Sequence, residues 1–310
     1  MSHAFLSLNS GYQFFVFAIF NNKQKFLGRV KRDMETLILP NGDKVPKLGL
    51  GTWGMGERRG DLSVEVKAIR HALDVGICLL DTAEMYGDGG AEEIIGLALK
   101  GIAQKPYIVS KVYPHNASSN GVLAACDRSL NRLGVERIDL YLLHWRGAIE
   151  FQETIEGFER LVENGKIGAW GVSNMDASDM AEIWSTPGGV ACQTNQVLYN
   201  LSRRWPEDRL IPEMAQRRVP VMAYSPLEQG RLAADSRLQE IADEAGMQPL
   251  DLALAWVVSQ KDVFAIPKSV SPQRIDAFVQ AVMKPLHSDL FAALEMAFPP
   301  PSLGAPIEML

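Results

Sequence analysis

Three short apolar runs of this chain carry polar side chains at or just after their ends: LLDTAEMY (residues 79–86), YIVSKV (107–112) and LYLLHW (140–145). The polar positions are Asp81, Tyr86, Lys111 and His144. A phenol has an unperturbed pKa of about 10, so a tyrosine needs a nearby cation and a hydrogen-bonding partner before it becomes a good acid at neutral pH. A lysine and a carboxylate can supply both, which predicts a proton-transfer site.

Strand-like runs of this kind alternate with helical patterns along most of the chain. The runs are Lys47–Gly51, Ile77–Asp81, Tyr107–Lys111, Leu140–His144, Ile167–Ser173, Thr194–Val197, Val221–Tyr224 and Val263–Pro267. Between them, apolar residues recur every three or four positions, as in residues 62–73, and residues 250–258 are apolar nearly all round. About eight such repeats between Met34 and Leu310 predict a (β/α)8 barrel, which takes roughly 250 residues.

A doubly wound sheet is the alternative fold, and three glycines favour it. Gly49, Gly51 and Gly54 spell G-x-G-x-x-G just after an apolar run. That motif binds a dinucleotide only when its third glycine opens a helix whose N-terminus holds the pyrophosphate. Here a polar loop follows instead, and the helical pattern starts near Ser63. The missing context favours the barrel.

The first 33 residues differ from the rest. The apolar stretch FFVFAIF (residues 14–20) is too short to span a bilayer, and the basic residues follow it, whereas a signal peptide has them in front. We therefore expect residues 1–33 to be an appendage, either disordered or not translated, before a single domain over residues 34–310. That domain opens with two apolar runs around Asn41-Gly42, which predict a β-hairpin capping the barrel.

Composition limits the classes of protein that are possible. The chain has 310 residues, of which 47% are hydrophobic and 22% are charged, as expected of a soluble globular domain. The net charge of −6 argues against a nucleic-acid or anionic-membrane partner. Three cysteines, Cys78, Cys126 and Cys192, show neither disulfide nor metal-ligand spacing. We expect a cytoplasmic monomer without a metal site.

Barrel geometry would bring the four polar residues together. Side chains at the carboxyl ends of barrel strands face one shared cleft, so Asp81, Lys111 and His144 should converge, with Tyr86 in the loop that follows Asp81. Each residue alone has an ordinary structural interpretation, such as a helix cap for Asp81. The coincidence of all four at strand ends favours a catalytic site.

Seven motifs carry a resemblance to a known family. DTAEMYG (residues 81–87), IVSKV (108–112), LLHW (142–145), GVSN (171–174), NQVLYN (195–200), AYSPL (223–227) and IPKS (266–269) occur in this order. In order and spacing they resemble the aldo-keto reductases, and the resemblance covers residues 36–300. Several of these motifs are similar to those of bacterial members of the family that reduce methylglyoxal and other small aldehydes.

The resemblance implies a role for each of the four polar residues. Tyr86 matches the general acid, Lys111 and Asp81 match the ion pair that lowers its pKa, and His144 matches the group that orients the substrate carbonyl. Hydride attack on a carbonyl carbon builds negative charge on the oxygen, so a positioned acid lowers the barrier. The hydride must come from a cofactor, because no side chain can donate one.

The resemblance also implies a nicotinamide cofactor without a glycine fingerprint. It matches Ser173, Asn174 and Gln196 to carboxamide contacts, Tyr224 to the ring that stacks on the nicotinamide, and Ser225 and Leu227 to pyrophosphate contacts. Each of these motifs could otherwise be an ordinary strand end followed by a cap or a proline turn.

A cluster of basic and hydroxyl residues predicts which cofactor binds. Lys268, Ser269 and Arg274 lie close to a helix start capped by Ser271, which makes an anion site suited to a 2′-phosphate. NADPH is therefore expected in preference to NADH. The family often has Glu-Asn, in contact with adenine, three and four residues beyond the arginine. At these positions this chain has Ala277 and Phe278.

Substrate selectivity is expected from aromatic and apolar residues at the same end of the barrel. The candidates are Trp53, Met55 and Trp145, with the loop around Arg204-Trp205 and the C-terminal tail. Such a cleft favours compact or apolar carbonyl compounds.

The predicted function is NADPH-dependent reduction of small aldehydes or ketones, including 2-oxoaldehydes such as methylglyoxal, to alcohols. Three alternatives stay open. One is a Schiff-base aldolase with Lys111 as nucleophile. Another is an NADPH-binding regulatory subunit without significant turnover. The third is a sugar- or alcohol-oxidising dehydrogenase, which would run the same site in the opposite direction.

Overall fold

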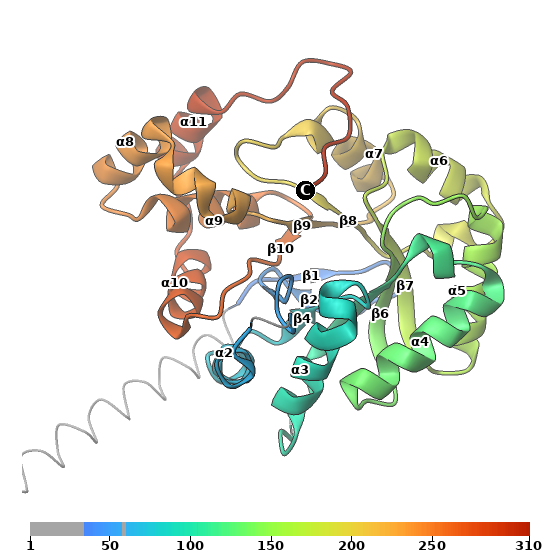
Figure 1. Ribbon diagram of the computed structural model, residues 1–310. Coiled ribbons are helices and arrows are strands. Elements are labelled where there is room, and N and C mark those ends of the chain that lie inside the picture. The colour runs from blue at the N-terminus through green and yellow to red at the C-terminus, as the bar shows by residue number, and fades with distance from the viewer. Residues whose placement is uncertain (1–33, 58–59, 104) are drawn as a thin grey trace, which may run out of the picture.

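The computed structural model describes residues 34–57, 60–103 and 105–310, and its centre is one parallel sheet whose strands follow chain order (Figure 1). The strands are β3 (Leu50–Gly51), β4 (Leu79–Asp81), β5 (Tyr107–Val112), β6 (Ile138–Leu143), β7 (Ile167–Ser173), β8 (Asn195–Leu198), β9 (Val221–Tyr224) and β10 (Val263–Ala265). Every neighbouring pair is parallel, as β-strands joined by crossover helices must be.

The first and last strands of this sheet close it into a barrel. Parallel bridges join Leu48 to Ala265 and Gly51 to Lys268, and the Gly49 amide donates a hydrogen bond to the Ala265 carbonyl at 2.9 Å. A Cβ atom on Gly51 would lie 2.9 Å from the carbonyl oxygen of Ile266. The glycine therefore permits the close approach of β3 to the segment that follows β10. The predicted (β/α)8 barrel is confirmed.

Helices surround the barrel (Figure 1). They are α2 (Leu62–Asp74), α3 (Gly90–Leu99), α4 (Ser119–Leu133), α5 (Phe151–Glu163), α6 (Ala177–Ser185), α7 (Leu210–Gln216), α8 (Ser236–Glu244), α9 (Pro249–Ser259), α10 (Pro272–Val282) and α11 (Ser288–Ala297). Asp61 caps α2 through the amides of Ser63 and Val64, so the first long helix starts where the sequence pattern predicts.

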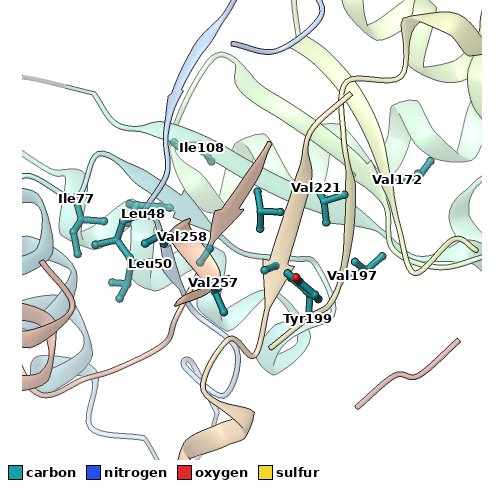
Figure 2. Close-up of a cluster of buried hydrophobic side chains, with 14 of the residues drawn as sticks. Leu48, Leu50, Ile77, Ile108, Val172, Val197, Tyr199, Val221, Val257 and Val258 are labelled. Atoms are coloured by element: carbon teal, nitrogen blue, oxygen red, sulfur yellow. The ribbon is translucent and has the colours of Figure 1, made fainter. Parts of the chain in front are cut away.

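The apolar core has two shells, because alternate strand residues face opposite sides of the sheet. The inner shell fills the barrel with Leu79, Val109, Leu140, Leu142, Ala169, Met222, Phe264 and Ile266. The outer shell lies between strands and helices, and Figure 2 shows part of it, including Leu50 of β3, Val197 of β8, and Val257 and Val258 of α9. Residues Leu252–Val258 of α9 are all buried, as predicted for a helix that is apolar on every side.

An N-terminal hairpin closes one end of the barrel. Strands β1 (Thr36–Ile38) and β2 (Lys44–Pro46) pair in antiparallel fashion around a turn in which Gly42 has φ of 92°. Leu39 and Val45 are buried against the inner shell. The predicted hairpin is confirmed. Asp43 in its turn accepts a hydrogen bond from Tyr107 at the start of β5, so the hairpin lies at the amino ends of the strands.

The predicted appendage over residues 1–33 lies outside the described residues. Of the helices in the part of the chain that the structure describes, none is long and apolar enough to cross a membrane.

Candidate active site

The strand periodicity that fills the barrel also positions the polar residues. Leu79, Val109 and Leu142 belong to the inner shell. The residue two positions further along each strand faces the same way, one layer nearer the open end of the barrel. These residues are Asp81, Lys111 and His144. Parallel register then brings them side by side, since β5 pairs with both β4 and β6.

Lys111 lies at the centre of a buried hydrogen-bond network. Its Nζ donates to the Asp81 carboxylate at 2.9 Å, to the Thr82 carbonyl at 2.7 Å and to the Tyr86 hydroxyl at 3.1 Å. Gln196 donates from Nε2 to the other Asp81 oxygen at 2.7 Å. All three protons of the ammonium group are engaged, which fixes its orientation toward the tyrosine.

Burial controls the protonation of this network. It raises the pKa of Tyr86 well above its ordinary value, and the Asp81 carboxylate raises it further. Burial also raises the pKa of Asp81 and lowers that of Lys111, although each opposes the shift of the other. Desolvation dominates the direction of the shift in the Tyr86 pKa, and the lowering expected from the ion pair stays a prediction. Tyr86 remains a protonated phenol.

His144 lies beside this network in the neutral form. Its ring centroid is 5.7 Å from that of Tyr86 and 4.8 Å from that of Trp145. Burial and the charge of Lys111 place the pKa of the imidazole well below its usual value. Its buried Nδ1 has no hydrogen-bond partner among the described residues. A neutral imidazole can donate to a carbonyl oxygen without carrying a competing charge.

Close contacts between glycines position the loop that carries Tyr86. The 3-10 turn η1 (Tyr86–Gly89) leads directly into α3, and it packs against the loop after β3. A Cβ atom on Gly56 would lie closer than 3.0 Å to the backbone of Gly90 and Ala91. Gly56 also has φ of 74°, in the left-handed region. Backbone contact without side chains thus sets the position of the tyrosine.

We expect Gly56→Ala to destabilise the protein and displace Tyr86. The added methyl group needs backbone movement, which costs about 1–3 kcal/mol, beyond about 1 kcal/mol for the positive φ. Gly101→Ala is the matched control, because Gly101 has φ of 77° but a Cβ atom added there would meet no described atom within 4 Å. Chemical denaturation should show the larger loss for Gly56→Ala, together with reduced turnover. Equal losses for the two variants would contradict the role of the close contact.

A cavity of about 1030 Å³ extends from these residues across the open end of the barrel. Of the residues predicted from sequence, those that line it are Trp53, Asp81, Tyr86, His144, Trp145, Ser173, Asn174, Gln196, Tyr224, Ser225, Leu227, Lys268, Ser269 and Arg274. Lys111 lies behind this wall and reaches the cavity through Tyr86.

Two predictions about the substrate pocket are wrong. Met55 is fully buried in the outer shell and does not line the cavity, because the turn at Gly54 directs it into the core. Trp205 is also buried in that shell. Arg204 binds Glu207 and the Phe298 carbonyl, so this loop anchors the C-terminal segment and does not form the cavity wall.

The predicted carboxamide contacts form one connected group. Ser173 donates to the Gln196 carbonyl at 2.8 Å, and the Asn174 amide donates to the His144 carbonyl at 3.1 Å. The Tyr224 hydroxyl donates to Asn174 Oδ1 at 3.1 Å. These bonds fix an aromatic face and an amide next to the catalytic residues, an arrangement that fits a flat ring bearing a carboxamide.

The predicted anion site retains free cations. Lys268 and Arg274 are exposed, line the cavity, and form no ion pair with described residues. Ser269, which follows Lys268 in the sequence, is buried, and its Oγ accepts a hydrogen bond from the Ser271 amide. Ser271 in turn caps α10 through the Arg274 amide. Two uncompensated cations near a capped helix start fit a phosphate group.

Met309 and Leu310 of the C-terminal tail line the cavity, in agreement with the expectation for that tail. Three further lining residues were not expected from the sequence: Met85, Leu250 and Asp251. The C-terminal segment crosses the open end of the barrel (Figure 1), where the Leu310 amide donates to the Tyr224 hydroxyl at 3.4 Å. No local pattern marks Met85, Leu250 and Asp251, because they reach the cavity through long-range folding.

The aldolase alternative loses its support in this geometry. A Schiff-base lysine needs a neutral amine with free access to a carbonyl carbon. Lys111 is fully buried, paired with Asp81 at 2.9 Å, and absent from the cavity wall. Its ammonium group therefore lacks the free access to the cavity that a Schiff-base nucleophile needs.

The barrel and its cavity define a class of protein: an enzyme with a buried acid–base site at the carboxyl ends of its strands, next to an elongated ligand cleft. Comparison with known families narrows this class, since the model of the aldo/keto reductase family matches residues 47–297. The chain belongs to the aldo/keto reductase family.

Several relatives share most of their length with this chain. Methylglyoxal reductase YeaE of Escherichia coli is 43% identical over 89% of this chain and 99% of its own length. Glyoxal reductase of Bacillus subtilis is 32% identical over 78% of this chain and 84% of its own. A crystal structure of an aldo-keto reductase from Klebsiella pneumoniae in complex with NADPH is 42% identical, with a TM-score of 0.86 over 89% of this chain and 99% of that chain.

Proposed function

We propose that this protein reduces small aldehydes and ketones, including 2-oxoaldehydes such as methylglyoxal, to alcohols with NADPH. The observation that carries the proposal is the hydrogen bond from Lys111 to the Tyr86 hydroxyl, at the wall of a cavity that also holds two free cations. The relatives named methylglyoxal and glyoxal reductase, and the related enzyme crystallised with NADPH, support it.

In the proposed mechanism Tyr86 gives its proton to the carbonyl oxygen. Its raised pKa keeps the proton in place until charge develops on that oxygen. The Lys111 ammonium, 3.1 Å from the hydroxyl, stabilises the phenolate as it forms, and Asp81 holds the lysine in place. Neutral His144 donates to the same carbonyl oxygen and orients it.

The cofactor supplies the hydride, and this chain supplies its binding site. We assign the nicotinamide end to Ser173, Asn174, Gln196 and Tyr224, the pyrophosphate to Ser225 and Leu227, and the 2′-phosphate to Lys268, Ser269 and Arg274. Apolar residues around the catalytic group, including Trp53 and Trp145, limit water there and so strengthen each electrostatic contact.

The 2′-phosphate assignment predicts a selective loss of affinity. Changing Lys268 and Arg274 together to Ala should weaken NADPH binding at least tenfold, because charge-assisted hydrogen bonds to phosphate are lost. NADH affinity should change by less than about twofold. Fluorescence titration with both dinucleotides measures this, with Lys261→Ala as control for the loss of an exposed cation. An equal loss for NADH would reject the assignment.

The activity itself is tested by steady-state kinetics. With NADPH, the protein should turn over methylglyoxal and glyoxal. The kcat/KM values for aromatic aldehydes and sugars should then show how large a substrate the cavity accepts. Cofactor binding without turnover on this panel would favour the regulatory-subunit alternative.

We also propose that residues 34–310 form the functional unit, acting as a cytoplasmic monomer. The odd number of cysteines, without disulfide spacing, suits a reducing compartment and supports the cytoplasmic location. Size-exclusion chromatography with light scattering tests the monomer.

A further inference from the structure

The cavity continues past the anion site to a wall formed by two helices. Ala277 and Phe278 of α10 line it there, together with Leu250 and Asp251 of α9. The family pattern has Glu-Asn in contact with adenine at the two α10 positions, whereas a methyl group and a phenyl ring cannot form those hydrogen bonds. If adenine has a polar contact here, another residue must provide it.

Asp251 is the carboxylate available at this wall. Among the described residues that line the cavity, only Asp81 and Asp251 carry side-chain carboxylates, and Asp81 is held by Lys111 and Gln196. Asp251 is half-buried, and its carboxylate accepts no hydrogen bond from described residues. Burial raises its pKa, which Lys284 only partly opposes. A carboxylate that no described donor engages is available to accept a hydrogen bond from a ligand.

The neighbours of Asp251 fit a purine. Leu250, Arg274 and Ala277 line an adjoining cavity of about 280 Å³ with it, so the carboxylate lies beside the proposed 2′-phosphate site. Leu250 and Phe278 offer apolar surface for an aromatic ring. The ordinary alternative is that Asp251, in the first turn of α9, only stabilises the helix dipole. In that role, Asp251 would not make the affinity for the dinucleotide depend on which base it carries.

We propose that Asp251 accepts a hydrogen bond from the 6-amino group of the adenine of NADPH, replacing the contacts that Ala277 and Phe278 cannot make. The inference rests on the proposed function, since it requires NADPH to bind in this cavity. It makes Asp251 a determinant of cofactor specificity at the base, independent of the 2′-phosphate.

The test compares NADPH with reduced nicotinamide hypoxanthine dinucleotide phosphate, in which a carbonyl oxygen replaces the 6-amino group. Fluorescence titration gives both dissociation constants without turnover. The wild-type protein should prefer NADPH by about tenfold or more, as expected for a hydrogen bond to a charged group. Asp251→Ala should bring the ratio close to one, and Asp251→Asn, which keeps an acceptor oxygen, should give an intermediate ratio.

The ratio is the diagnostic quantity, because removing a negative charge near the phosphates changes the affinity for both dinucleotides alike. Asp243→Ala, on the exposed face of α8, controls for the charge and should keep the wild-type ratio. Equal binding of the two dinucleotides by the wild type, or an unchanged ratio in Asp251→Ala, overturns the inference and leaves the proposed function intact. Failure of the wild type to bind either dinucleotide overturns both.

Discussion

Replacing Tyr86 with Phe should lower the turnover number for aldehyde reduction by about 10²- to 10⁴-fold, the usual contribution of a positioned general acid. The ring remains and fills the same space, so NADPH affinity should stay within about twofold of the wild-type value. Lys111 keeps its bonds to Asp81 and to the Thr82 carbonyl, so the free energy of unfolding should fall by only about 1 kcal/mol.

Single-turnover kinetics at saturating NADPH isolate this chemical step from product release. Tyr107→Phe is the control, since Tyr107 is a largely buried tyrosine at the start of β5, whose hydroxyl faces Asp43 near the hairpin. It should leave turnover unchanged. Substantial reductase activity in Tyr86→Phe would contradict the proposed mechanism.

The second large effect is expected from Asp81→Asn, which leaves the Lys111 charge buried without a counter-ion. Breaking a buried pair in this way typically costs about 3–5 kcal/mol. Turnover should also collapse, because Lys111 loses the partner that orients it toward Tyr86. Asp235→Asn is the control: Asp235 pairs with an exposed Arg237 and caps α8, and Asn retains the cap, so a loss below about 1 kcal/mol is expected.

The pH dependence of this loss distinguishes charge burial from a packing defect. Burial lowers the pKa of Lys111, and in Asp81→Asn the opposing attraction disappears. The unfolded chain, with a lysine pKa of about 10.4, then binds one more proton than the folded chain below that pH and above the folded pKa. Stability of the variant should therefore rise with pH through this window, and its deficit should be smaller at pH 9 than at pH 6. Denaturant unfolding at both values measures it.

A double variant separates stability from catalysis. Adding Lys111→Met to Asp81→Asn removes the stranded charge, so much of the lost free energy of unfolding should return. The protein should nevertheless stay inactive, because nothing stabilises the Tyr86 phenolate. Recovery of both stability and activity would contradict the proposed role of Lys111.

Strand periodicity made much of the site predictable. Asp81, Lys111 and His144 each lie two residues beyond an inner-shell residue, so alternation alone places them on the inside of the barrel. The same argument holds for Tyr224, which follows Met222. These relations are local in the sequence, and closing the barrel adds only that the strand ends meet.

Other features depend on which distant segments pack together. Met55 lies two residues from Trp53 in the sequence. Met55 is nevertheless buried in the core, whereas Trp53 lines the cavity and is 54% exposed. Asp251 belongs to a helix whose pattern indicates burial and nothing else. Their surroundings come from contacts between segments far apart in the chain, which no local pattern encodes.

The barrel, the four polar residues at its strand ends and the basic cluster at Lys268 and Arg274 can be read from the sequence, because period-two and period-3.6 patterns and short motifs are local properties. Other properties appear only in the folded protein: burial raises the pKa of Tyr86, Met55 points into the core, and Asp251 lines the end of the cavity where Ala277 and Phe278 lack polar groups. Desolvation and cavity shape are sums over residues from the whole chain, so they exist only once it has folded.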